Sequence, residues 1–271
     1  MSTHNCDTCP AHAHLAQMGL KVDAFDRVVA LAGNPNTGKS TLFNALTGLK
    51  QHTGNWPGKT VSRAEGGFQF GGVRYKLVDL PGTYSLLSAS QDEEIARDFL
   101  LFGTPDCTIV VVDATALERN LNLVLQVLEI TGRTVIAVNL MDEARRKGLE
   151  VDVRSLARDL GVPAVPVVAR TGEGLHALLA SVEGVISGEI PTAPTRAGGT
   201  PEFTAAIAEL VPMIEAVAPG VPNARWIAIR LLDGDDRVEQ ALNTGELATM
   251  VERQQRPDQR FSRQIALQGQ Q

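Results

Sequence analysis

Cysteine is scarce in this sequence, and its placement excludes a disulfide framework. Only three cysteines occur among 271 residues. Cys107 opens an apolar run, where a small buried thiol is expected. Cys6 and Cys9 lie too close to the N-terminus to staple a core. This usage favours a reduced, cytoplasmic setting.

Basic residues are too few for a protein that mainly binds nucleic acid. The chain has 25 Lys and Arg against 31 Asp and Glu, which gives a formal net charge of -6. Binding to a phosphate backbone needs clustered positive charge. No nucleic-acid partner is therefore expected.

Long hydrophobic runs are lacking. The longest apolar runs have about six residues, whereas a helix that crosses a bilayer needs about 18 or more. The first residues also lack the basic and then apolar pattern of a secretory signal. We therefore expect the chain as given to be soluble.

What is present is an alternation of short β-rich runs with amphipathic stretches, from about residue 26 to 188. This pattern is typical of an α/β domain around a mostly parallel sheet. A Gly71-Gly72 turn joins two runs and predicts an antiparallel hairpin at one sheet edge. The predicted strands are Arg27 to Ala32, Ser62 to Phe70, Val73 to Asp79, Thr108 to Asp113, Thr134 to Asn139 and Val165 to Val168.

A stretch rich in Pro, Gly and Thr begins at Gly188 and predicts a linker. Beyond it, Phe203 to Val217 and Trp226 to Leu232 have helical spacing, and Pro212 is expected to kink or split the first helix. The predicted organisation is an N-terminal extension over residues 1–24, an α/β domain over 25–188 and a small all-helical domain over 189–271.

The residues after the first predicted strand match the P-loop pattern without a mismatch, and a helix from Thr41 to Thr47 follows. Glycines let consecutive N–H groups and the helix N-terminus face the β- and γ-phosphates of a nucleotide. Lys39 adds a full charge, and the Ser40 hydroxyl is predicted to ligate Mg²⁺. The residues expected at the phosphates are Gly33, Asn34, Pro35, Asn36, Thr37, Gly38, Lys39, Ser40 and Thr41.

A second motif predicts that the base is guanine. Asn139-Leu140-Met141-Asp142 follows an apolar strand and resembles the NKxD signature of Ras-like GTPases. The Asp142 carboxylate is suited to accept hydrogen bonds from both the N1–H and the exocyclic amine of guanine. Leu140 stands where the signature has Lys, so a side chain that packs over the base and braces the loop is missing.

The segment Asp79-Leu80-Pro81-Gly82 closes another strand and resembles the DxxG element of the same superfamily. In that element the carboxylate holds the Mg²⁺ shell and the glycine amide faces the γ-phosphate. The resemblance gives these roles to Asp79 and Gly82. Asp79 also stands at a strand end, which points into the ligand crevice of an open α/β sheet.

Two further loops are predicted to contact the nucleotide. The stretch from His52 to Val61 is polar, glycine-rich and without periodicity, as expected of a switch loop around Mg²⁺ and γ-phosphate. Thr60 is its candidate switch threonine and Mg²⁺ ligand. The other residues assigned to the nucleotide here are Asn55, Trp56, Pro57 and Gly58, and Val168, Ala169 and Arg170 where Ras-like proteins place a loop that contacts guanine O6.

Hydrolysis is predicted to be slow, because Thr83 replaces the water-orienting Gln that usually follows DxxG in Ras-like enzymes. Asn36 resembles the Asn of potassium-activated GTPases, which binds a K⁺ that supplies the charge of an arginine finger. This resemblance adds Asn36 to the predicted catalytic set of Lys39, Thr60 and Gly82. An Asn that only holds the turn is the competing interpretation.

Four stretches together resemble the FeoB family of ferrous iron transporters. The Asn-Trp-Pro-Gly string and a Trp-containing helix matter most, because generic GTPases lack both. The stretches are Gly33 to Ser40, Asn55 to Val61, Asp79 to Leu86 and Arg225 to Asp235.

The resemblance implies a G domain over residues 25–188 and a helical domain over 189–271. It implies a cytoplasmic domain at the inner face of the inner membrane that binds GTP and GDP, uses Mg²⁺ and K⁺, and regulates Fe²⁺ transport. Implied partners are the membrane-embedded iron-transport domain, small Feo accessory proteins and further copies of the chain. Glu93 and Glu94 resemble an acidic switch feature of the family, with solvated surface charge as the alternative.

The front of the chain departs from the family core. Cys6, Cys9, His12 and His14 offer ligands for a tetrahedral Zn²⁺ or Fe²⁺ site; a flexible tail with incidental Cys and His is the alternative. Two other functions stay open at this point. One is an Era-like RNA- or ribosome-associated GTPase, a group that carries a basic RNA-binding appendage, and the other is a metal-sensing module that acts through this tail.

Overall fold

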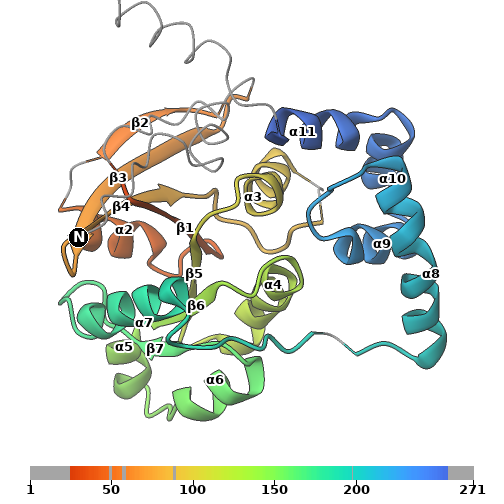
Figure 1. The fold of residues 1–271 in the computed structure, drawn as a ribbon. Coiled ribbons are helices and arrows are strands. Elements are labelled where there is room, and N and C mark those ends of the chain that lie inside the picture. Colours follow the sequence, from red (N-terminus) through yellow and green to blue (C-terminus); the bar gives the residue numbers. More distant parts are fainter. Residues whose placement is uncertain (1–24, 49–50, 57–58, 88–89, 197, 256–271) are drawn as a thin grey trace, which may run out of the picture. The chain divides into compact units, whose positions relative to one another are not determined.

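The computed structural model describes residues 25–48, 51–56, 59–87, 90–196 and 198–255. These residues divide into two compact units, of which the first ends at Gly198 and the second begins at Gly199. Figure 1 shows the elements of both units.

The first unit is built on a seven-stranded sheet with the order β2-β3-β4-β1-β5-β6-β7 (Figure 1). β4, β1, β5, β6 and β7 run parallel, whereas β2, β3 and β4 pair antiparallel. The prediction of an α/β fold with a mostly parallel sheet is confirmed. The strands are β1 Arg27–Gly33, β2 Gln51–Asn55, β3 Ser62–Phe70, β4 Val73–Asp79, β5 Cys107–Asp113, β6 Thr134–Asn139 and β7 Ala164–Pro166.

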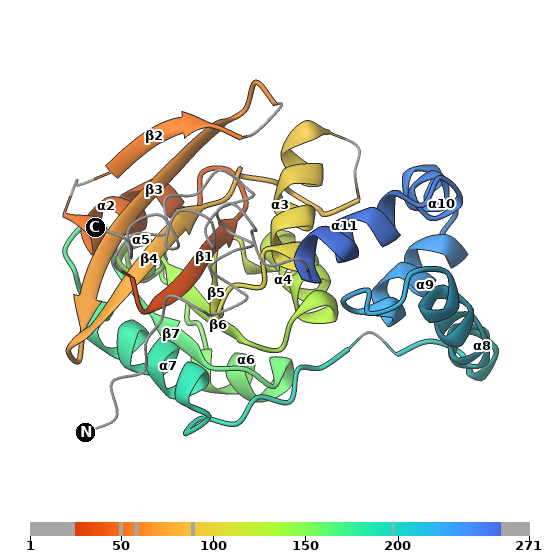
Figure 2. The same ribbon diagram turned by 45° about the horizontal axis from the view of Figure 1, so that its top comes forward.

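Helices cover both faces of the sheet, with α2 and α7 on one face and α3 and α4 on the other (Figures 1 and 2). The strands β5 and β6 are buried along their length, as expected for parallel strands covered on both sides. The helices are α2 Lys39–Thr47, α3 Gln91–Phe102, α4 Leu117–Ile130, α5 Met141–Arg146, α6 Val153–Leu160 and α7 Leu175–Ser187.

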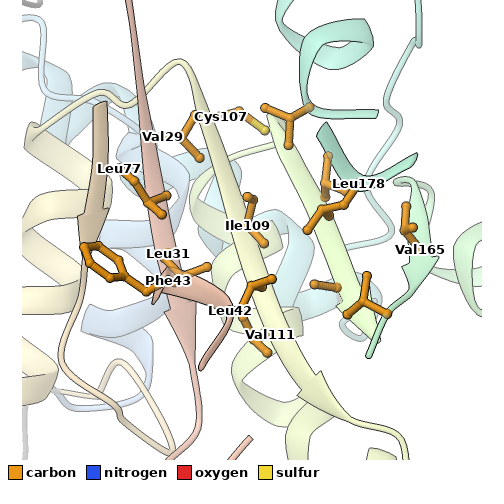
Figure 3. Close-up of a cluster of buried hydrophobic side chains, with 14 of the residues drawn as sticks. Val29, Leu31, Leu42, Phe43, Leu77, Cys107, Ile109, Val111, Val165 and Leu178 are labelled. Atoms are coloured by element: carbon orange, nitrogen blue, oxygen red, sulfur yellow. The ribbon is translucent and has the colours of Figure 1, made fainter. Parts of the chain in front are cut away.

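One apolar core lies between the sheet and the pair α2 and α7. Figure 3 shows Leu31 and Ile109 of the strands beside Leu42 of α2 and Leu178 of α7. Cys107 belongs to this cluster, and its burial raises the pKa of the thiol to about 12. The prediction of a small buried thiol at Cys107 is confirmed.

The strand β2 was not predicted, because the stretch from His52 was expected to be irregular. Gln51 pairs with Gly66 and Asn55 with Ser62 of β3. The predicted hairpin of β3 and β4 is present, but β2 rather than the hairpin forms the edge of the sheet. The polar sequence of β2 has no apolar alternation, so its extended form comes from backbone pairing with β3 and not from a pattern of its own.

The segment predicted as a linker lies partly against the first unit. The Ala193 N–H donates to the Gly161 carbonyl at 2.9 Å, and the Thr195 N–H donates to the Leu160 carbonyl at 2.9 Å. These bonds pair carbonyl groups at the end of α6 that the helix itself leaves open. The division between the units comes after this segment, at Gly199.

The second unit is all-helical. Side-chain caps define its helix starts: Thr200 accepts from the Phe203 N–H, and Asn223 accepts from the Trp226 N–H. The helix over Pro201–Val217 is not divided at Pro212, so the predicted split is wrong, and the predicted kink stays a prediction. Pro212 and Ala208, one turn before it, are both exposed residues. The helices are α8 Pro201–Val217, α9 Ala224–Leu232, α10 Asp236–Asn243 and α11 Glu246–Gln255.

None of the helices in the described part of the chain has the length and apolar content that a bilayer-spanning helix needs.

The contact between Gly161 and residue 193 yields a stability prediction. Gly161 has φ 69, and a Cβ there would overlap the Ala193 carbonyl. Gly161→Ala should lower the free energy of unfolding by about 3 kcal/mol or more, because a clash adds to a left-handed strain of about 1–2 kcal/mol.

Gly188→Ala is the matched control, since Gly188 has φ 80 and open space around its Cβ position. Gly188→Ala should lower the free energy of unfolding by the backbone strain alone, about 1–2 kcal/mol. Urea unfolding of both variants measures the difference, and equal losses would contradict the clash.

Candidate functional site

The P-loop joins the end of β1 to the start of α2 in a tight curl. Asn36 and Gly38 have left-handed backbones, with φ 67 and 81. The Thr37 hydroxyl donates to the Asn34 carbonyl at 2.9 Å. A Cβ at Gly33 would lie 2.7 Å from the Val111 carbonyl oxygen of β5. A loop of this shape presents consecutive N–H groups to an anion.

Lys39, the first residue of α2, reaches the end of β4. Its ammonium donates to Asp79 Oδ1 at 2.5 Å and to the Leu80 carbonyl at 2.7 Å. Burial raises the pKa of the Asp79 carboxyl, and the Lys39 charge opposes that shift. The fold thus brings together the group predicted to hold phosphate and the group predicted to hold Mg²⁺.

The rest of the DxxG loop lies against the P-loop. A Cβ at Gly82 would lie 3.5 Å from the Pro35 nitrogen. Thr83 is buried, while Ser40 and Thr41 are exposed at the start of α2. The backbone at Gly82 therefore lies beside the P-loop, and the role of its N–H at the γ-phosphate stays a prediction.

Asn139 ties two of the predicted loops together. Its side chain is 1% exposed. The Nδ2 group donates to the Thr37 carbonyl at 2.9 Å, and Oδ1 accepts from the Ala169 N–H at 3.0 Å. Gly38 passes so close that any Cβ there would overlap the Asn139 amide. Asn139 therefore fixes the P-loop against the loop at residues 168–170.

Asp142 is held by arginines. Arg170 donates to Asp142 Oδ2 at 3.1 Å, and the Arg146 guanidinium lies 3.9 Å from the same oxygen. Leu140 has a left-handed backbone, φ 61, and approaches Gly38. The sequence placed Asp142 and Arg170 at the base separately and gave no sign of their ion pair, because they lie 28 residues apart.

The switch loop is anchored on α3. The Trp56 ring is buried and meets the Phe99 ring edge-on, with 5.6 Å between centroids. The Lys59 ammonium donates to Glu94 Oε2 at 2.9 Å. Thr60 is exposed. Pro57 and Gly58, also predicted at the nucleotide, lie outside the described residues.

Some side chains near the site were missed by the sequence. Phe99 was not singled out, although its spacing on α3 predicts a buried side chain.

Asn34 was expected at the phosphates, yet it is 3% exposed, and neither of its amide atoms has a hydrogen-bond partner within the described residues. No sequence signal separates a buried Asn from an exposed one in a P-loop.

The Cys/His cluster at the front, Cys6, Cys9, His12 and His14, lies outside the described residues. Within the ranges that are described, no group of three or more His, Cys, Asp or Glu is placed to hold a metal ion.

Two family models match this chain. A family model described as ferrous iron transport protein B matches residues 27–182, and one described as the FeoB cytosolic helical domain matches residues 200–264. The Fe(2+) transporter FeoB of Escherichia coli K12 is 38% identical over 217 residues, which is 76% of this chain and 27% of that protein. The chain therefore spans about a quarter of the length of the curated relatives that it matches.

Solved structures of similar sequence share the fold. The cytosolic domain of L. pneumophila FeoB has a TM-score of 0.73 at 35% identity and covers 85% of this chain and 91% of its own. A mutant of S. thermophilus NFeoB bound to GDP has a TM-score of 0.72 at 34% identity, covering 84% of this chain and 88% of its own.

The Asn139 bridge yields a second stability prediction. Asn139→Ala leaves a buried carbonyl and a buried N–H without partners, at about 1–3 kcal/mol each. We expect the free energy of unfolding to fall by about 2–6 kcal/mol.

Asn122→Ala, on the exposed side of α4, is the control and should change stability by less than about 0.5 kcal/mol. Chemical unfolding compares the two variants. A similar small loss of stability in both variants would show that Asn139 does not hold the two loops together.

Proposed function

The chain belongs to the family of ferrous iron transport protein B, and on that premise we propose that it is a GTP-binding and slowly GTP-hydrolysing switch domain. In this proposal it regulates ferrous iron transport through a membrane domain that is not in this chain. The G domain is the part over residues 25–188, and the helical domain is the part over 189–271.

The observation that carries the proposal is that four motifs lie together where strands of the sheet end. They are the P-loop, the DxxG element, the segment from Asn139 to Asp142 and the loop at residues 168–170. Lys39 contacts Asp79, Gly82 lies beside Pro35, and Asn139 joins Thr37 to Ala169. Phosphate and base would then be held by parts that are already fixed relative to each other. Binding of GDP by a similar FeoB domain supports guanine as the base.

Three oxygen donors suit Mg²⁺: the Ser40 and Thr60 hydroxyls and the Asp79 carboxylate. Mg²⁺ takes oxygen ligands and keeps several waters, so few protein ligands are needed. Asp79 stands at the end of β4 beside Lys39, which fits a site that also receives phosphate oxygens. When bound, the ion neutralises charge that develops on the β- and γ-phosphates.

Catalysis rests on Lys39, the Gly82 N–H and Asn36. Lys39 and Gly82 donate to the transferring phosphoryl group, and Thr83 supplies no carboxamide to orient water. Asn36 would hold K⁺, whose charge would stand in for that of an arginine finger. The exposed position of Asn36 in the P-loop suits an ion that also contacts the nucleotide. Its left-handed backbone suits the competing structural role as well, because Asn tolerates that conformation.

The chain acts in the cytoplasm, next to the membrane domain of the longer protein. A similar solved structure is described as a cytosolic domain, and the longer relatives are described as Fe(2+) transporters. Small accessory proteins of the same system and further copies of the chain are additional proposed partners. The Cys6, Cys9, His12 and His14 metal site also stays a prediction.

An RNA-associated function has no observation in its favour. The two family models together cover residues 27–182 and 200–264, and the chain is acidic overall. We therefore do not propose the Era-like alternative.

Base selection by Asp142 is testable with a single substitution. Asp142→Asn replaces one acceptor oxygen with a donor. Guanine offers two donors, so its affinity should fall by about a hundredfold or more. Xanthine has a carbonyl where guanine has its amine, so XDP should gain affinity. Fluorescent-nucleotide titration measures both.

Asp159→Asn, at an exposed ion pair on α6, is the control and should leave the affinity for GDP unchanged. Retained guanine selectivity in Asp142→Asn would remove Asp142 from base recognition.

Potassium dependence tests the role of Asn36. GTP hydrolysis should be faster in K⁺ than in Na⁺ by about tenfold or more, since the ion supplies transition-state charge. Asn36→Gly should abolish this stimulation. Glycine adopts the left-handed backbone freely, so the substitution removes the carboxamide without straining the loop.

Phosphate-release assays in the two salts give the ratio for each protein. Equal rates of the unmodified chain in K⁺ and Na⁺, or stimulation that survives in Asn36→Gly, would overturn the K⁺ mechanism and favour the structural role.

A further inference from the structure

The side chain of Arg170 links the two segments that are predicted to surround the base. Its guanidinium donates to Asp142 Oδ2 at 3.1 Å. The Arg170 side chain is 75% exposed, and that of Asp142 is 25% exposed. An ion pair with so exposed a member contributes little to stability, because water screens the charges and the long side chain loses freedom. The fold therefore depends little on this pair.

The backbone on either side of Arg170 is fixed. The preceding Ala169 N–H donates to the buried Asn139 side chain at 3.0 Å. The Val168 carbonyl accepts from the Thr171 N–H at 3.1 Å, which closes a turn around Arg170. The guanidinium therefore starts from a defined place in the loop.

A second ion pair joins the same loop to α5. The Arg145 guanidinium donates to Glu173 Oε1 at 2.6 Å. Asp142 and Arg145 both lie on α5, whereas Arg170 and Glu173 lie in the loop. Each side thus contributes one acid and one base to the two pairs. The helix that carries Asp142 and the loop that carries Arg170 are held together at both points.

The contact with Arg170 leaves most of the Asp142 carboxylate open to a base. An ionised carboxylate has about four acceptor positions, two on each oxygen. Among the described residues, the side-chain hydrogen bond to this carboxylate goes to Oδ2 and none goes to Oδ1. Guanine needs two positions, one for N1–H and one for the exocyclic amine. The same carboxylate can therefore bind the base and the guanidinium at the same time.

We infer that Arg170 is a positioning residue for guanine recognition, and that it takes the place of the lysine that the motif lacks at Leu140. The hydrocarbon side chain of Leu140 cannot pair with a carboxylate, so the brace comes from the other loop. Arg170 holds the Asp142 carboxylate in the orientation that accepts both donors of guanine. This inference rests on the proposed function and gives a side chain of the last loop a part in base selection.

Orientation of Asp142 can be separated from simple attraction of charge. A guanidinium near the site also attracts the phosphates of any nucleotide. That attraction is the same for GDP and for inosine diphosphate (IDP), whose base lacks only the exocyclic amine. Orientation of the carboxylate matters more for GDP, which donates two hydrogen bonds to it, than for IDP, which donates one. The ratio of the two affinities therefore reports the role of Arg170.

The first experiment measures this ratio for Arg170→Ala. We expect the dissociation constant of GDP to rise about tenfold, the low end for losing a hydrogen bond to a charged group, and that of IDP to rise about twofold or less. Competition against a fluorescent guanine nucleotide gives both constants. The midpoint of urea unfolding should stay the same, because Arg170 is largely exposed.

Arg158→Ala is the matched control, because Arg158 forms an exposed ion pair with Asp159 on α6. It should leave both dissociation constants unchanged. Equal losses of GDP and IDP affinity in Arg170→Ala would mean that the guanidinium only attracts phosphate. Tighter binding of GDP would mean that Arg170 blocks Asp142. Either result overturns the inference.

The second experiment returns a lysine to the motif. Leu140→Lys in the Arg170→Ala background should bring the ratio of GDP to IDP affinity back to within about twofold of the unmodified chain. The same substitution in the unmodified chain should change the ratio by less than about twofold, because the brace is already present. No gain in the first background, or equal gains in both, would show that Arg170 does not replace the lysine.

The third experiment tests whether Arg170 acts through Asp142. In an Asp142→Ala background, Arg170→Ala should leave the ratio of GDP to IDP affinity unchanged, because the group that Arg170 positions has been removed. Calorimetry at high nucleotide concentration measures these weaker affinities. A change of the ratio as large as in the unmodified chain would contradict the inference.

The outcomes separate this inference from the proposed function. If the unmodified chain binds no guanine nucleotide, both are overturned. If it binds GDP in preference to IDP and Arg170→Ala keeps that preference, only the role of Arg170 is overturned.

Discussion

The hydrogen bonds of the Asn139 carboxamide set the distance between the two ends of the site. One bond goes to the Thr37 carbonyl in the P-loop, and the other comes from the Ala169 N–H in the last loop. Both partners are backbone groups, so the spacing does not depend on the side chains at positions 37 and 169. Because Asn139 is buried where β6 ends, the sheet fixes the spacing between the P-loop and the loop at residues 168–170.

Charged groups of the site already have partners in the structure. Lys39 is paired with Asp79, Asp142 with Arg170, and Lys59 with Glu94. Leaving partly buried charges unpaired would be costly. Ligand binding at such a site exchanges one partner for another, so affinity is a difference between two sets of contacts. An exchange of ion-pair partners on ligand binding would be one route from the site to the neighbouring segments.

Local chemistry made part of this structure predictable. The bounds of β3, β4 and β6 follow from apolar patterns and turns, and the P-loop follows from a complete motif in its strand-and-helix context. The strand β2 did not follow, because its extended form depends on β3 and not on its own polar residues. The partners of Trp56 were also hidden: Phe99 lies 43 positions further along the chain, and no pattern in one sequence records such a contact. The motifs thus predicted which residues gather, but not how the charges and rings among them pair.

The place of β2 at the edge of the sheet has a consequence for solubility. Without β2, β3 would be the free edge of the sheet, and free edges invite strands of other molecules. On β3, Arg63 and Glu65 form an ion pair at 2.7 Å, and Lys76 of β4 lies 2.6 Å from the same carboxylate. An incoming strand would have to pack apolar side chains over these shielded charges. The same three charged side chains would therefore disfavour edge-to-edge pairing if β3 became the edge of the sheet.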